Sequence, residues 1–161
     1  MMKEEVIDTL KNSKMRDHHP FWIWESIMST PKMLGECLKE PTYNQVKIVA
    51  ENCKRKKVDK IFLLGTGSSY FATVAEKFAF ETYAGIQTSS HLTTEFREYP
   101  PANFGNHSAV FFHSHSGGTK GDPETVQKVC DLGGYAVGIT DIKVRRTNAP
   151  SRSALIEPGG S

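Results

Sequence analysis

Two short segments rich in serine, threonine and glycine carry the residue types best suited to ligand chemistry. The first segment is Thr66, Gly67, Ser68 and Ser69, and the second has hydroxyls at Ser114, Ser116 and Thr119 around Gly117 and Gly118. Each hydroxyl can donate one hydrogen bond, and glycine lets backbone N–H groups approach a ligand closely. A helix is expected to follow each segment, and its unpaired N–H groups would favour an anion. Together these groups predict a cradle for a phosphate monoester.

The spacing of the candidate residues argues against several other kinds of functional site. His113 and His115 alternate on one expected strand, but neither His91 nor His107 has the spacing of a third ligand, so we expect no metal and no cofactor. Tyr70 stands where a dinucleotide-binding GxGxxG sequence requires its third glycine. Residues 117–120 lack the spacing of a P-loop, and residues 67–71 lack the GxSxG pattern of a serine hydrolase.

Alternating apolar runs and helical patterns predict the elements that position these two segments. Strands are expected at 60–65, 86–92, 108–114 and 135–140, with 153–157 as a further candidate, and helices at 68–83, 93–98 and 123–132, the last capped by Asp122. Two helices are expected before them, one starting around Pro31 and one at 43–57. The pattern predicts an α/β fold of three αβα layers, flavodoxin-like, around a five-stranded (at least four-stranded) parallel sheet. Ligands bind such sheets at the carboxyl ends of the strands, where both segments are expected.

Composition limits the classes of partner. The chain has 161 residues, about one domain, and a net charge of +2, which gives no electrostatic case for nucleic acid. No apolar run approaches the roughly 20 residues of a membrane span, so we expect no membrane partner. Three widely spaced cysteines, Cys37, Cys53 and Cys130, predict reduced thiols in a cytoplasmic protein.

Three motifs together resemble the sugar isomerase (SIS) domain family. They are Leu63 to Tyr70 after the first expected strand, Thr94-Glu95-Phe96-Arg97 after the second, and Ser114 to Thr119 after the third. They match the family's G-[ST]-S, S-E-F and S-x-S-G-x-T patterns over roughly residues 58–142. Lys120-Gly121 looks inserted before the next helix, so one alignment ends at Thr119 and another at Thr125. The resemblance implies a phosphosugar ligand held by Ser114, His115, Ser116 and Thr119, with Thr66, Gly67, Ser68 and Ser69 lining the same pocket.

The segment before the domain narrows the resemblance. Residues 25–31 are similar to an E-I-x-x-Q-P segment that precedes the isomerase half of glucosamine-6-phosphate synthase and related fructosamine-6-phosphate deglycases. We therefore expect an N-terminal helical segment at 1–42 and an SIS domain at 43–161. The synthase's glutaminase half needs an N-terminal cysteine, and no cysteine precedes Cys37, which favours a deglycase or isomerase without that half.

The resemblance leaves alternatives open on function. The chain is expected to bind a ketose, aldose or fructosamine 6-phosphate as the first half of a two-domain isomerase or deglycase. The alternative is a non-catalytic module that senses phosphosugars. Glu95 is the best carboxylate near the expected pocket, although in the family this residue is more often structural. SIS domains commonly pair, so we expect a homodimer or pairing with a second SIS domain.

Overall fold

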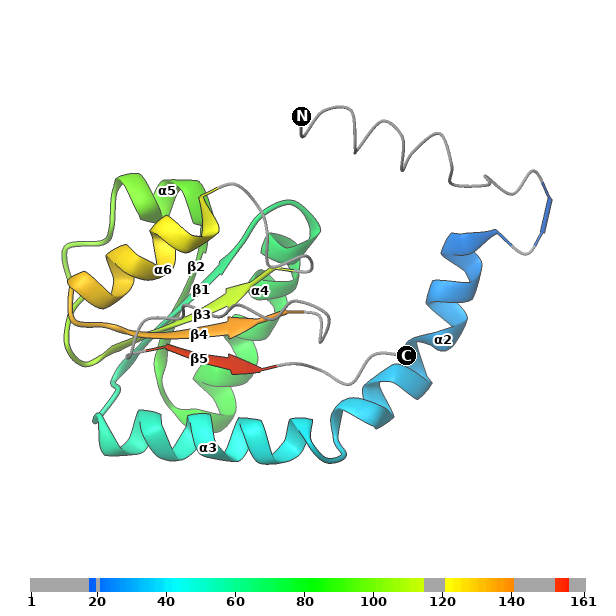
Figure 1. Cartoon of the computed structure of the whole chain (residues 1–161), viewed down its shortest axis with the longest axis horizontal. Coiled ribbons are helices and arrows are strands. Elements are labelled where there is room, and N and C mark those ends of the chain that lie inside the picture. The colour runs from blue at the N-terminus through cyan, green and yellow to red at the C-terminus, as the bar shows by residue number, and fades with distance from the viewer. Residues whose placement is uncertain (1–17, 20, 115–120, 141–152, 157–161) are drawn as a thin grey trace. The chain divides into compact units, whose positions relative to one another are not determined.

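The computed structural model describes residues 18–19, 21–114, 121–140 and 153–156 (Figure 1). The chain divides into two compact units, 1–35 and 36–161. Helix α2 (Trp22–Cys37) runs through the end of the first unit and carries exposed apolar side chains, among them Ile23, Trp24 and Ile27. Pro31 lies inside α2, so the prediction that a helix begins near Pro31 is wrong. The aromatic run before Pro31 is itself helical, so Pro31 lies in the interior of α2, where a proline removes one backbone hydrogen bond and its ring crowds the carbonyl four residues earlier. The boundary expected at residue 42 stays a prediction.

The second unit contains a five-stranded parallel sheet, which confirms the predicted fold class. Its strand order is β2-β1-β3-β4-β5, and every neighbouring pair is parallel. The strands are β1 (Lys60–Gly65), β2 (Gln87–Leu92), β3 (Ser108–His113), β4 (Tyr135–Ile139) and β5 (Ser153–Ile156). The two hydroxyl-rich segments follow β1 and β3, which are neighbours in the middle of this order.

Burial on both faces of the central strands explains their continuous apolar sequence. Odd-numbered residues such as Leu63 and Phe111 join Val49 of helix α3 (Thr42–Arg55) in one core cluster. Helix α4 (Ser68–Ala79) lies on the same side of the sheet (Figure 1). Even-numbered residues such as Leu64 and Phe112 join a second cluster with side chains of α5 (Thr93–Glu98) and α6 (Asp122–Asp131). The sheet therefore lies between two helical layers, as expected for parallel strands.

Another helix boundary differs from its prediction by more than two residues. A single helix was expected from 68 to 83, but α4 ends at Ala79 and a π-helical turn, η1 (Phe80–Ala84), follows it. Phe80 within this turn packs against the cluster that contains Leu63, so the wider turn keeps an aromatic side chain on the core. Within the described part of the chain, no helix combines the length and apolar character needed to cross a bilayer.

Candidate functional site

The sheet brings the two hydroxyl-rich segments to one edge. In the β1–β3 pair Leu64 lies opposite Phe112, so both strands end at the same level, at Gly65 and His113. Thr66, Gly67, Ser68 and Ser69 follow the first end, and Ser114 follows the second. His115, Ser116 and Thr119 lie outside the described residues.

The first segment turns sharply from β1 into α4. Thr66 and Ser68 are exposed and Ser69 is half-buried, so hydroxyl groups of this turn can reach a ligand. The turn depends on Gly65, because a Cβ atom at this position would lie 2.6 Å from the backbone carbon of Ser69 and 2.6 Å from the nitrogen of Tyr70. Glycine therefore lets the first turn of α4 sit directly against the end of the strand.

A buried hydrogen bond joins Ser114, where the second segment begins, to the first residue of α6. The Ser114 hydroxyl donates to Oδ2 of Asp122 at 2.7 Å, and both side chains are buried. The Ser114 amide also donates to the Ile139 carbonyl, which fixes the start of the segment to β4. Asp122 is the first residue of α6 rather than its cap, and Gly121 is the capping residue without a side-chain hydrogen bond. The predicted capping role of Asp122 is thus wrong: its carboxyl group is the partner of Ser114.

In the alternative alignment of the third motif, the last hydroxyl is that of Thr125, which lies on α6. Thr125 is buried, and its hydroxyl donates to the Gly121 carbonyl at 2.8 Å within the first turn. That proton already has a partner inside the helix, so Thr125 stabilises the turn rather than presenting a donor to a ligand.

Glu95 lies in the first turn of α5, where its side chain is exposed. Its charge acts on His91, the last polar residue of β2. Burial lowers the pKa of the His91 ring, and the negative charge of Glu95 partly opposes this effect. Sequence reasoning gave His91 no role beyond that of a possible metal ligand.

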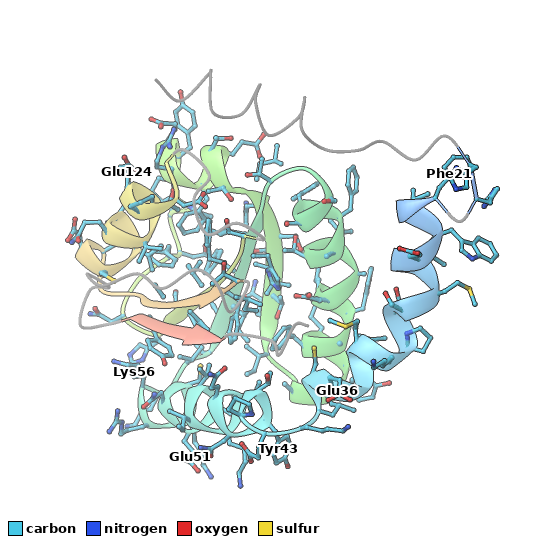
Figure 2. The ribbon with its side chains drawn as sticks, turned by 45° about the vertical axis from the view of Figure 1, so that its right-hand side comes forward. Phe21, Glu36, Tyr43, Glu51, Lys56 and Glu124 are labelled. Carbon is cyan, nitrogen blue, oxygen red and sulfur yellow. The ribbon has the colours of Figure 1, made fainter. Side chains whose placement is uncertain are left out.

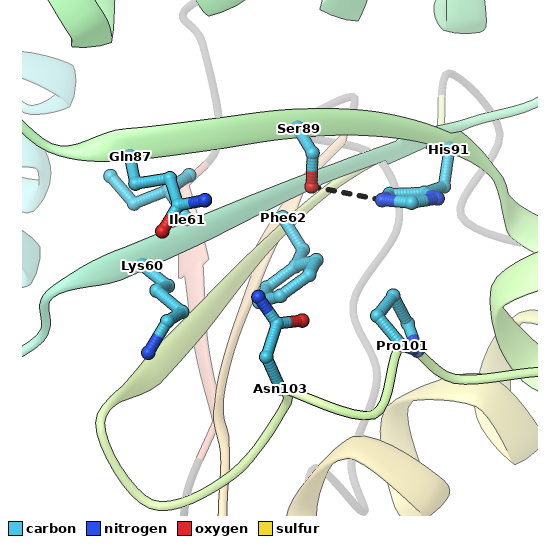
Figure 3. A pocket seen from close by; sticks show the side chains of 8 residues that line it. All are labelled: Lys60, Ile61, Phe62, Gln87, Ser89, His91, Pro101 and Asn103. Atoms are coloured by element: carbon cyan, nitrogen blue, oxygen red, sulfur yellow. Dashed lines mark hydrogen bonds between the residues drawn. The ribbon is translucent and has the colours of Figure 1, made fainter.

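His91 lines a cavity on the α5–α6 side of β1 and β2 (Figure 3). The cavity has a volume of about 250 Å³, and Ser89 lies beside His91 with 2.9 Å between its hydroxyl and Nε2. The Phe62 ring, Pro101 and Asn103 form its walls, with Lys60 and Gln87 toward the start of the strands. Among the described residues, no side chain that was predicted to bind a phosphosugar lines this cavity.

Two other described histidines, His113 and His107, each have one ring nitrogen beside a protein partner. Nε2 of His113 lies 3.0 Å from Oε2 of Glu76 on α4, and Nδ1 of His107 lies 3.3 Å from the Lys56 carbonyl. Among the described residues no group of three or more histidine, cysteine or acidic side chains could hold a metal ion. One polar group that sequence reasoning missed is the hydroxyl of Thr93, the first residue of α5, which is buried and lacks a hydrogen-bond partner in the described part. Side chains of the second unit are drawn in Figure 2, where Glu124 marks the first turn of α6.

Comparison with known proteins identifies one family. Residues 55–146, more than half of the chain, match the family model of the SIS domain. No curated protein matches the chain.

Solved structures share the fold at low sequence identity. Tagatose-6-phosphate ketose/aldose isomerase from Escherichia coli is 16% identical, with a TM-score of 0.64 over 87% of this chain and 40% of that chain. The C-terminal domain of glucosamine-fructose-6-phosphate aminotransferase from Francisella tularensis is 20% identical, with a TM-score of 0.58 over 80% of this chain and 40% of that chain. Glucosamine-6-phosphate deaminase from Thermotoga maritima is 20% identical, with a TM-score of 0.53 over 78% of this chain and 40% of that chain. The chain therefore spans less than half the length of each of these structures.

We expect Gly65→Ala to destabilise the fold, because its Cβ would collide with backbone atoms of Ser69 and Tyr70 that cannot move independently of α4. A clash of this kind in a packed region costs about 1–3 kcal/mol of unfolding free energy, measured by urea denaturation. Gly105→Ala is the matched control, because no atom lies within 4 Å of a Cβ at that position. Equal losses in the two variants would contradict the close packing of α4 on β1.

We expect the pKa of His91 in the folded protein to lie below the ordinary histidine value of 6.5. The unfolded chain then takes up a proton at higher pH than the folded one. The contribution of His91 to stability is therefore present above pH 6.5 and is lost as the pH falls through its folded pKa. NMR titration of the ring signals gives this pKa directly, and urea denaturation of His91→Asn between pH 5 and 8 should show a weaker pH dependence than the unaltered chain. A ring that titrates at or above 6.5 would refute the effect.

Proposed function

Because the chain belongs to the SIS domain family, we propose that it binds a phosphosugar at the carboxyl ends of β1 and β3. One observation carries this proposal: two hydroxyl-rich segments leave neighbouring buried strands at the same edge of the sheet. Ligands of open parallel sheets bind at this edge. The helices that follow the segments, α4 and α6, direct their N-terminal N–H groups there as well.

The proposed contacts divide between the two segments. Thr66 and Ser68 are exposed and can donate hydrogen bonds from the first segment, with Ser69 beside them and the backbone of Gly67 close by. From the second segment we propose His115, Ser116 and Thr119, as the resemblance implies. The Ser114 hydroxyl donates its hydrogen bond to Asp122, so it can only accept a hydrogen bond from a ligand. Its chief role is to hold the segment in place.

We propose that the reaction class is isomerisation or deglycation of a ketose, aldose or fructosamine 6-phosphate. The names of two structural neighbours, a ketose/aldose isomerase and a glucosamine-6-phosphate deaminase, support this class. Such a reaction moves a proton between C1 and C2 of the open sugar, and a carboxylate is a suitable base for that step. Glu95 is the candidate base on this chain because it lies in the first turn of α5, directly after β2. The reduced cysteines fit a cytoplasmic setting.

We also propose that the site works in a pair formed by a second copy of this chain. The outer face of α4 carries the exposed apolar side chains Phe71, Val74 and Phe78, with exposed fractions of 72%, 38% and 64%. They recur at helical spacing and form one stripe. An apolar helical stripe on a chain that spans less than half of its structural neighbours suits a partner domain of the same kind.

Binding should depend on the second segment. We expect fructose 6-phosphate to bind the unaltered chain in isothermal titration calorimetry, and Ser116→Ala to weaken binding about 10- to 100-fold through loss of a hydrogen bond to a charged group. Ser89→Ala is the matched control, since this serine lines the separate β1–β2 cavity, and it should leave the affinity within about twofold.

Two outcomes would count against the proposal in different ways. A folded chain without affinity for any sugar phosphate would overturn phosphosugar binding. Binding without turnover of fructose 6-phosphate in the presence of an amine, or of a fructosamine 6-phosphate, would leave the chain as a phosphosugar-sensing module.

Pairing should depend on the α4 stripe. Light scattering should give about twice the monomer mass of 18.0 kDa for the unaltered chain, and the double variant Phe71→Glu, Phe78→Glu should be monomeric because charge at these positions disfavours burial. Tyr99→Glu places the same charge at a residue 83% exposed on another surface and should leave the mass unchanged. A monomeric unaltered chain would exclude the pair.

A further inference from the structure

We propose that Arg97 binds the phosphate group in this site and makes the site select phosphorylated over neutral sugars. The inference rests on the proposed phosphosugar function and adds a cation to a cradle that otherwise consists of neutral donors. Arg97 belongs to the Thr94–Arg97 segment, one of the three family motifs, to which the resemblance gives no ligand role.

The Arg97 guanidinium lies against the turn that closes the second segment. A Cβ atom on Gly121 would meet Nη1 of Arg97 at 1.9 Å and its Cζ at 3.2 Å, so the planar group covers the open side of this glycine. Gly121 is buried and adopts a φ of +94°. It is also the capping residue of α6 and directly precedes Asp122, the partner of Ser114. The cation is therefore held beside the closing hydrogen bond of the second segment.

Arg97 is held in place, yet most of its donors are unused. Its carbonyl accepts a hydrogen bond from Nζ of Lys128, and its Nε donates to Oε1 of Glu98 at 2.8 Å. Within the described residues, this bond to Glu98 is the one hydrogen bond that the guanidinium makes. A guanidinium carries five N–H groups, so the four on Nη1 and Nη2 remain for a ligand. Because the side chain is already ordered, less conformational entropy is lost when those groups bind.

The charges around this turn explain why a cation is needed there. Asp122 and Glu124 both lie in the first turn of α6 and oppose the approach of a phosphate dianion. Hydroxyl donors such as those of Ser68 and Ser69 supply hydrogen bonds but no opposite charge. The Arg97 guanidinium matches the geometry of phosphate oxygens and offsets the two carboxyl groups. A neutral sugar gains nothing from this charge, so the effect is specific for the phosphate ester.

Calorimetry with fructose 6-phosphate, fructose and inorganic phosphate tests the role of Arg97. We expect Arg97→Gln to weaken the binding of fructose 6-phosphate and of inorganic phosphate about 10- to 100-fold, because a charge-assisted hydrogen bond is lost. It should also flatten the dependence of affinity on salt between 50 and 300 mM, a readout that a purely structural role would not move. Arg97→Lys should recover part of the affinity. Glu98→Gln is the control, since the amide oxygen can still accept from Nε of Arg97 while the neighbouring negative charge is lost, and it should not weaken binding.

The outcomes separate this inference from the proposed function. Suppose that Ser116→Ala lowers the affinity for fructose 6-phosphate, whereas Arg97→Gln keeps an affinity within twofold of that of the unaltered chain and the same salt dependence. The role of Arg97 is then overturned and the phosphosugar site stands. If inorganic phosphate binds in an Arg97-dependent way but no sugar phosphate does, the phosphosugar function fails and the anion role stands. Binding of neither overturns both. Should Arg97→Gln not fold, the arginine Nε signal of the unaltered chain must shift on adding inorganic phosphate, and a static signal refutes the contact.

Discussion

Pairing of the two central parallel strands, β1 and β3, is the constraint on which the rest of the second unit depends. Both strands are buried on both faces, so each contributes side chains to two separate cores. The polar backbone groups of such strands are paired within the sheet, and the burial of alternate side chains in the two cores selects their register. The register in turn ends both strands at one level. The hydroxyl-rich segments are therefore neighbours because the cores require it, whatever ligand they bind.

In the turns that follow these strands, glycine is needed because other parts of the chain approach the backbone closely. Gly65 allows α4 to begin against the strand end, and Gly121 lies under the Arg97 guanidinium in a left-handed conformation. The Ser114–Asp122 hydrogen bond then ties the start of one segment to the first residue of α6. Such a bond is buried, and leaving either partner unpaired would cost about 1–3 kcal/mol. Site geometry and stability thus rest on the same few contacts.

Local patterns predicted most of the fold but few of its side-chain partners. The apolar run at 60–65, which ends in a glycine, is sufficient to predict a buried strand, and alternation with helices predicts that the strands are parallel. Pro31 and Asp122 were misassigned because proline and aspartate are each favoured at helix starts, whereas Pro31 lies inside α2 and Asp122 pairs with the Ser114 hydroxyl. The π-helical turn at 80–84 was not predicted either, and its Phe80 packs against a core formed by residues distant in the sequence.

The sequence by itself determined the class of site: hydroxyls and glycines at the ends of buried strands, in the order of the SIS motifs. It could not determine which of these hydroxyls are free, because that depends on partners distant in the chain. Only the tertiary structure paired Ser114 with Asp122, directed the Thr125 proton to Gly121, and brought Arg97 from α5 against the turn before α6. The physical reason is that hydrogen bonds and charge contacts act over a few ångströms in space, while sequence patterns record only neighbours along the chain.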